Sequence, residues 1–117
     1  DQRSITHQVR RGKSMRILLK VSFPIDKANA TIKDGSLPKK MQAILAEQKP
    51  EAAYFTTVDG LRGGYIVVNL QDASQLPAYA EPWFLAFNAT VEAQPVMLPE
   101  DIAKAGPAIE RAVKNYA

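Results

Sequence analysis

The sequence predicts a single α+β domain with the element order β-α-β-β-α-β and one further helix at the C-terminus. The length of 117 residues is that of one domain, since single domains usually run to about 100–200 residues. Hydrophobic residues make up 46% of the chain and charged residues 23%, which is the mixture of an ordinary folded protein. Apolar residues alternate with a period of two in four segments and recur at helical spacing between them. Together these observations predict a sheet with packed helices.

The first strand is predicted over residues 16–23, where apolar side chains alternate along the chain. Pro24 ends this strand, and apolar residues then recur at helical spacing. Asp34-Gly35-Ser36 interrupts the helical pattern, and its serine can cap a second helix. We therefore expect two helical pieces, at residues 26–34 and 37–48.

The middle of the chain predicts a β-hairpin. Residues 52–58 and 64–70 are rich in β-branched and aromatic side chains, and the short segment Asp59-Gly60-Leu61-Arg62-Gly63 separates them. This glycine-rich segment has no Lys-Ser/Thr pair and leads into a strand, so it does not resemble a phosphate-binding loop. We expect it to be the hairpin turn.

The second half of the chain predicts a helix, a strand and a final helix. Asp72-Ala73-Ser74 supplies a capping signal for a helix that Pro82 kinks, and residues 89–97 alternate as a strand. Residues 99–116 read as a helix that breaks near Gly106-Pro107. The complete order is the ferredoxin-like, split βαβ arrangement, with one four-stranded antiparallel sheet and both long helices on the same face.

Alternation assigns the strand residues to two faces of the sheet. The face that packs on the helices is almost wholly apolar and comprises Ile17, Leu19, Val21, Phe23, Ala53, Phe55, Thr57, Ile66, Val68, Leu70, Val91 and Ala93. The opposite face, called the second face below, is mixed and comprises Leu18, Lys20, Ser22, Tyr54, Thr56, Val58, Tyr65, Val67, Asn69, Thr90, Glu92, Gln94 and Val96. Large apolar patches usually mark interfaces, so the second face predicts a homodimer.

The net charge of +3 belongs to the N-terminus. Residues 1–14 carry four basic side chains and one acidic, whereas residues 15–117 carry eleven of each sign. We interpret Met15 as the native start and residues 1–14 as a tag or upstream extension. The alternative is a basic N-terminal arm that touches nucleic acid or an acidic partner, but the cluster is too short to favour it.

Several function classes are disfavoured by composition. The absence of cysteine excludes disulfides and thiolate catalysis, and the single histidine, His7, disfavours a Ser-His-Asp triad or a multi-histidine metal site. No stretch approaches the roughly 20 apolar residues of a membrane span, and the aromatic residues do not interleave with a basic patch. We expect a cytoplasmic protein with no cofactor or metal and no contact with membrane or nucleic acid.

The element order, the second face and the ending VEAQPVMLPEDIAKA resemble the dimeric α+β barrel superfamily over residues 15–117. Within it, the chain is similar to small uncharacterised bacterial proteins. The resemblance implies homodimers that pair through their sheets. Several enzymes of the superfamily use a histidine in the cleft, and this sequence has none after His7, so no catalytic signature is carried over.

The favoured function is a homodimer whose paired sheets enclose a cavity for a small organic molecule. The predicted ligand-binding residues are Ser22, Tyr54, Thr56, Tyr65, Asn69, Trp83 and Gln94. The first alternative is a cofactor-independent monooxygenase or isomerase, with Glu92 as the base and Lys20 or a tyrosine stabilising an enolate-like intermediate. The second alternative is a structural dimer without ligand, in which Lys20 and Glu92 form a cross-sheet ion pair.

The segment 82–87 holds the densest aromatic cluster of the chain. We predict that Phe84 and Phe87 pack in the core. For Trp83 two positions remain open, one in the core and one at the rim of the ligand cleft.

Overall fold

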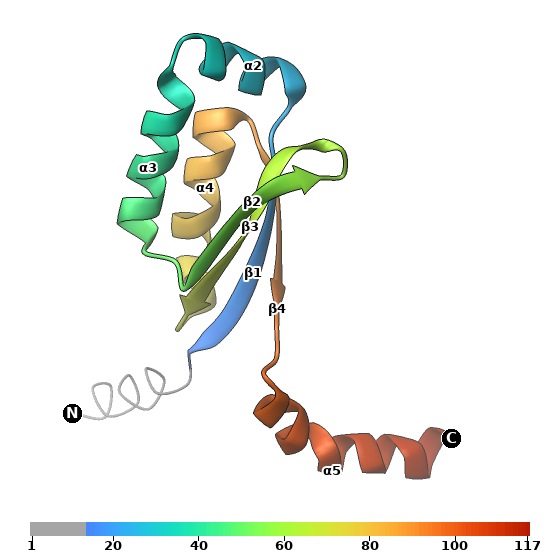
Figure 1. The fold of residues 1–117 in the computed structure, drawn as a ribbon. Helices are drawn as coiled ribbons and strands as arrows, with labels where there is room; N and C mark the ends of the chain where they lie inside the picture. Colours follow the sequence, from blue (N-terminus) through green and yellow to red (C-terminus); the bar gives the residue numbers. More distant parts are fainter. Residues whose placement is uncertain (1–13) are drawn as a thin grey trace, which may run out of the picture.

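The computed structural model of this protein describes residues 14–117 (Figure 1). Apart from Ser14, the predicted basic arm at residues 1–14 lies outside the described residues. The described part forms four strands, four α-helices and one 3₁₀ turn: β1 (Met15–Ser22), α2 (Ile25–Lys33), α3 (Ser36–Gln48), β2 (Ala52–Val58), β3 (Leu61–Leu70), the 3₁₀ turn (Ala73–Gln75), α4 (Leu76–Phe87), β4 (Thr90–Pro95) and α5 (Pro99–Tyr116). Two predicted helical pieces correspond to α2 and α3.

The strands form one open sheet in the order β2-β3-β1-β4, and every neighbouring pair is antiparallel. β1 runs between β3 and β4, so Leu19 lies opposite Ile66 on one side and Ala93 on the other. β2 and β3 form the predicted hairpin. The α+β class and the four-stranded antiparallel sheet are confirmed.

The core lies between the sheet and the helices α3 and α4, which stand on the same side of it (Figure 1). Leu19 and Val21 of β1 are almost completely buried in this core, as their alternation predicts. Trp83 and Phe87 of α4 have ring centroids 6.0 Å apart, and Phe23 packs against both rings. This aromatic cluster joins α4 to the end of β1, and burial of its apolar area stabilises the fold.

The hairpin turn is tighter than predicted. It consists of Asp59 and Gly60, and β3 begins at Leu61 instead of residue 64. Both turn residues have positive φ, 53° for Asp59 and 80° for Gly60, as a two-residue type I′ turn requires. Because the turn needs only this Asp-Gly pair, Leu61, Arg62 and Gly63 join the strand.

Some predicted positions are wrong. Phe84, predicted in the core, is 38% exposed because it borders a groove against β4. Phe55 lies on the helix side as predicted, but it is 44% exposed because it belongs to the edge strand β2. Val58, predicted on the exposed second face, is buried at the hairpin tip beside Gly63. The expected break near Gly106-Pro107 is absent, since α5 runs through both residues.

A proline removes one helical hydrogen bond, to the carbonyl four residues earlier, and for Pro107 that carbonyl belongs to the exposed residue Ala103. Water can satisfy this carbonyl, which explains why α5 continues. No helix within residues 14–117 is both long and apolar enough to cross a membrane.

Candidate functional site

The strand register gathers four of the predicted site residues into one row across the second face. Tyr54 of β2 lies opposite Tyr65 of β3, Tyr65 lies opposite Lys20 of β1, and Lys20 lies opposite Glu92 of β4. Side chains directly opposite on antiparallel strands have Cβ atoms about 4.5–5.5 Å apart, so the four groups are successive neighbours. The row joins two phenols, one cation and one carboxylate, and we call it the central row.

The other predicted residues of the second face flank the central row. On one side, Ser22 lies opposite Gly63, which in turn lies opposite Thr56. On the other side, Gln94 lies opposite Leu18. Leu18 also faces Val67, so an apolar pair occupies the middle of the two central strands next to the central row.

Lys20 is the electrostatic centre of the central row. Its Nζ lies 2.9 Å from Oδ2 of Asp59 and 3.4 Å from Oε2 of Glu92. The hydrogen bond to Asp59, followed by that to Glu92, raises the pKa of Lys20 above its ordinary value. One cation between two carboxylates leaves this part of the second face with a formal charge of −1.

Asp59 belongs to this site although the sequence analysis placed it only in a turn. Lys20 projects from the second face, so the contact with Asp59 shows that the hairpin turn bends toward that face. The burial of Val58, the preceding residue, fits the same bend. The sequence signal that could have found it is the Asp-Gly pair of a two-residue turn followed by two adjacent glycines, Gly63 and Gly64, inside the next strand.

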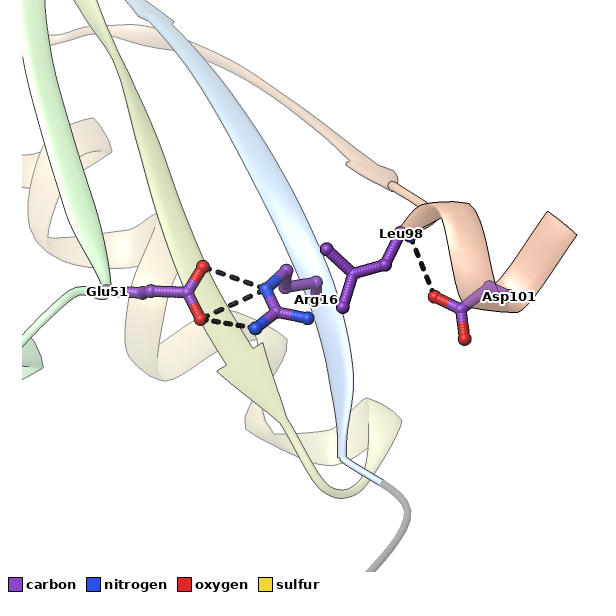
Figure 2. Close-up of polar contacts among 4 residues, drawn as sticks. All are labelled: Arg16, Glu51, Leu98 and Asp101. Carbon is purple, nitrogen blue, oxygen red and sulfur yellow. Dashed lines mark hydrogen bonds and ion pairs between the residues drawn. The ribbon is translucent and has the colours of Figure 1, made fainter.

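A second ion pair lies at the opposite end of β1 (Figure 2). Nε of Arg16 donates to both carboxylate oxygens of Glu51 at 2.8 and 3.0 Å, and its Nη2 lies 2.8 Å from Oε1. The hydrogen bond from Arg16 is the main cause that lowers the pKa of Glu51, and a hydrogen bond from Asn69 adds to it. The predicted ligand residue Asn69 is therefore placed beside this ion pair and away from the central row.

Stability should depend on pH through Glu51. Because the folded state lowers the pKa of Glu51 from its ordinary 4.5, this stabilisation is fully present above pH 4.5 and is lost as the pH falls through the lower folded-state value. Glu51→Gln should reduce the urea midpoint slightly at about pH 6 and by less at about pH 3. Glu47→Gln, at an exposed position of α3, is the control. An equal effect of Glu51→Gln at both pH values would contradict the assignment.

Trp83 does not reach the second face. It is completely buried on the helix side of the sheet, where its ring packs against Phe23 and Phe87. Of the two positions that the sequence left open, the core is the observed one.

A cleft that the sequence analysis missed lies on the helix side, between α2, α3 and the β2-β3 hairpin. It has a volume of about 370 Å³ and is lined by Phe23, Ile32, Leu37, Met41, Phe55, Thr56, Arg62 and Gly63. Nη1 of Arg62 donates to Oδ1 of Asn29 at 2.7 Å, which holds the guanidinium at the cleft. The sequence feature that could have indicated this cleft is the Asp-Gly interruption between α2 and α3. It separates Ile32 from Leu37 and leaves room beside Phe55.

Residues 14–117 contain no group of three or more His, Cys, Asp or Glu side chains that could hold a metal ion. The polar side chains of the second face are phenols, amides, hydroxyls and the Lys20 ion pairs.

Comparisons with known proteins give no match. No protein-family model matches the chain, and searches of curated proteins and of solved structures also return no match.

Proposed function

We propose that this protein is a homodimeric binding domain, in which the second faces of two sheets pair and enclose a site for a small organic molecule. The observation that carries the proposal is the central row, in which Tyr54, Tyr65, Lys20 and Glu92 stand side by side next to an apolar pair, Leu18 and Val67. Binding sites for small molecules typically combine apolar walls with a few polar groups that fix orientation.

The sheet order supports a ferredoxin-like arrangement and the resemblance to dimeric α+β barrels. Read from the other edge, the order is β4-β1-β3-β2, so β3 lies between β1 and β2 and β1 lies between β3 and β4. Each of the two β-α-β units is therefore split by a strand of the other unit, as in the split βαβ motif. In the superfamily that the sequence resembles, two such sheets face each other.

The exposure of the second face supports the pairing. Tyr54 is 68% exposed, and Leu18, Tyr65 and Val67 are half-buried. Within the described part of the chain, α3 and α4 stand on the other side of the sheet (Figure 1). Covering this surface with a second copy would remove apolar area from water.

Sedimentation of a Leu18→Lys variant tests the pairing. We expect the wild type to be a dimer at micromolar concentration and Leu18→Lys to raise the dissociation constant about tenfold or more, because a charge would be buried in the middle of the interface. Leu85→Lys, at a 77% exposed position of α4, is the control and should leave the dimer intact. A wild type that sediments as a monomer would refute the pairing.

The contact of Lys20 with Glu92 favours binding over acid–base catalysis. Glu92 contacts Nζ of Lys20 at 3.4 Å and its side chain is 66% exposed, whereas a general base usually sits in an enclosed, desolvated site. Native mass spectrometry of the purified dimer should detect a bound small molecule, and Glu92→Gln should retain it. Turnover of that molecule by the wild type and its loss in Glu92→Gln would instead establish the alternative, a cofactor-independent monooxygenase or isomerase.

The helix-side cleft supports a second candidate site within one chain. Its volume of about 370 Å³ is in the range of ligand pockets, its walls are mostly apolar, and Arg62 supplies a cation. This combination suits an apolar molecule with one anionic group.

The fluorescent probe anilinonaphthalene sulfonate has this chemistry. We expect it to bind the folded protein and Arg62→Met to weaken binding about tenfold, through loss of a charge-assisted hydrogen bond. Lys104→Met, on α5, should bind the probe like the wild type. Equal affinities for the wild type and Arg62→Met would eliminate this candidate.

A further inference from the structure

Helix α5 has no buried residue although it is the longest helix among residues 14–117. Figure 1 shows it beyond the end of β4 and pointing away from α3 and α4. Its four large apolar side chains, Ile102, Ile109, Val113 and Tyr116, are each at least 52% exposed.

These side chains form one narrow stripe. At about 100° per residue, Ile102, Ile109, Val113 and Tyr116 fall within an arc of about 60°. Ala105 and Ala112 lie beside this stripe. With them, residues alternately three and four positions apart line one side of the helix, namely Ile102, Ala105, Ile109, Ala112 and Tyr116. The charged residues Lys104, Arg111 and Lys114 point to the opposite side, and Glu110 lies about 90° from the middle of the stripe. A stripe this narrow is the seam by which one helix packs on another.

The composition of α5 indicates that the helix is not stable without a packing partner. Gly106 and Pro107 lie in its interior, and both residues have low helix propensity. Isolated helices of this length are marginal in water, and most helices in proteins are stabilised by packing of an apolar face.

The first turn of α5 is held in place by local contacts. Oδ2 of Asp101 accepts a hydrogen bond of 2.8 Å from the backbone N–H of Leu98, as Figure 2 shows. The charge of Asp101 also contributes to raising the pKa of Arg16 on β1. The start of the helix is thus fixed at the end of the sheet while the stripe faces solvent.

We propose that α5 pairs, antiparallel, with α5 of a second copy of this chain. Ile109 is midway between Ile102 and Tyr116, so a two-fold axis at Ile109 sets Ile102 of each chain near Tyr116 of the other. The small residues Ala105 and Ala112 let the two helices approach closely. Gly106, Ala108, Val113 and Asn115 flank the seam and are uncharged. Asp101 flanks its first turn, and an axis at Ile109 sets it near the last turn of the partner helix and away from the second Asp101, so these two like charges do not meet.

The inference rests on the proposed function, because it supplies contact area that the sheets lack. A four-stranded face is about 19 Å wide and about 20 Å long, or about 400 Å², whereas a standard interface buries about 800 Å² on each partner. A helix of this length, about 27 Å by 10 Å, adds about 270 Å². Sheet and helix together approach the standard size.

Cross-linking of introduced thiols tests the pairing, since the chain has no cysteine. In the full chain, Ile109→Cys on the stripe should form a covalent dimer with a short bismaleimide at micromolar concentration. Arg111→Cys, two residues away on the opposite side, is the matched control and should cross-link at least about tenfold more slowly, because its thiols would face apart. Equal rates for the two variants would overturn the proposal.

Sedimentation of Ile109→Lys separates this proposal from the pairing of the sheets. We expect a dissociation constant raised about 10- to 100-fold, with any loss of far-UV circular dichroism limited to the helical signal of the 18 residues of α5. If Leu18→Lys dissociates the dimer and Ile109→Lys does not, the sheets pair and the α5 proposal is wrong. If Ile109→Lys dissociates it and Leu18→Lys does not, α5 pairs and the proposed sheet interface is wrong. If deletion of residues 1–13 alone exposes a previously protected thiol at position 109, the N-terminal segment covers the stripe and the proposal is also wrong.

Discussion

Replacing Trp83 by alanine should lower the free energy of unfolding by about 3–5 kcal/mol, which is a large part of the stability of an ordinary domain. The side chain is completely buried, and its ring packs against Phe23 at the end of β1 and against Phe87 one helical turn further along α4. Alanine would leave a cavity at the point where helix and sheet meet. Urea unfolding followed by far-UV circular dichroism measures the loss, since the variant removes the only tryptophan fluorophore.

Two further variants are the controls for the Trp83→Ala prediction. Leu85→Ala, on the same helix but 77% exposed, should change stability by less than about 0.5 kcal/mol. Trp83→Phe should cost less than alanine, because it keeps an aromatic ring and removes the indole N–H, which has no hydrogen-bond partner among residues 14–117. A loss below about 1 kcal/mol for Trp83→Ala would mean that the α4 aromatic cluster does not hold the core.

The core could be predicted from the sequence because each side chain of a strand points to one of only two faces of the sheet. Leu19 and Val21 had to share a face, and that face is the buried one. Alternation gave the correct side for Phe55 but not its 44% exposure, and it gave the wrong burial for Val58, because burial also depends on where a strand lies in the sheet and on how it bends. β2 is an edge strand that the helices cover incompletely, and the tip of its hairpin turns toward the second face.

Contacts of the candidate site that follow from strand register could be predicted from the sequence. The contact that depends on the bend of the β2-β3 hairpin could not. Opposite positions on adjacent strands follow from pairing, so Lys20 and Glu92 were expected to be neighbours and are. Asp59 reaches Lys20 only because the hairpin bends, and no periodicity in the sequence encodes the direction of a bend. The exposed stripe of α5 depends on a contact outside the single chain, so alternation and spacing predicted the helix but not its surroundings.

Replacing Gly63 by alanine should destabilise the protein by about 1–3 kcal/mol and should loosen the contact of Asp59 with Lys20. A Cβ atom on Gly63 would clash with the carbonyl oxygen of Val21 and would lie 3.1 Å from Cα of Ser22. Both are backbone atoms of β1, so no side-chain rotation can relieve the clash. Urea unfolding measures the stability, and the titration of Lys20 followed by NMR measures the contact.

β1 cannot easily move away to make room for a side chain at position 63. The backbone of Phe23 donates a 2.8 Å hydrogen bond to the carbonyl of Arg62, immediately beside the clash, so moving the strands apart would break the ladder as well. Gly106→Ala is the matched control: its Cβ would meet nothing within 4 Å, and alanine favours a helix, so stability should be unchanged or raised by up to about 1 kcal/mol.

If Gly63→Ala were as stable as the wild type, the close approach of β3 to β1 would not be a feature of the folded protein. The bend that brings Asp59 over the second face could then not be attributed to this close approach. Because Asp59 makes the shorter of the two ion pairs of Lys20, its displacement would leave Lys20 with Glu92 alone and would lower the pKa of Lys20 toward its ordinary value of 10.5. The titration of Lys20 in Gly63→Ala therefore tests whether the close approach of β3 to β1 positions Asp59 beside Lys20.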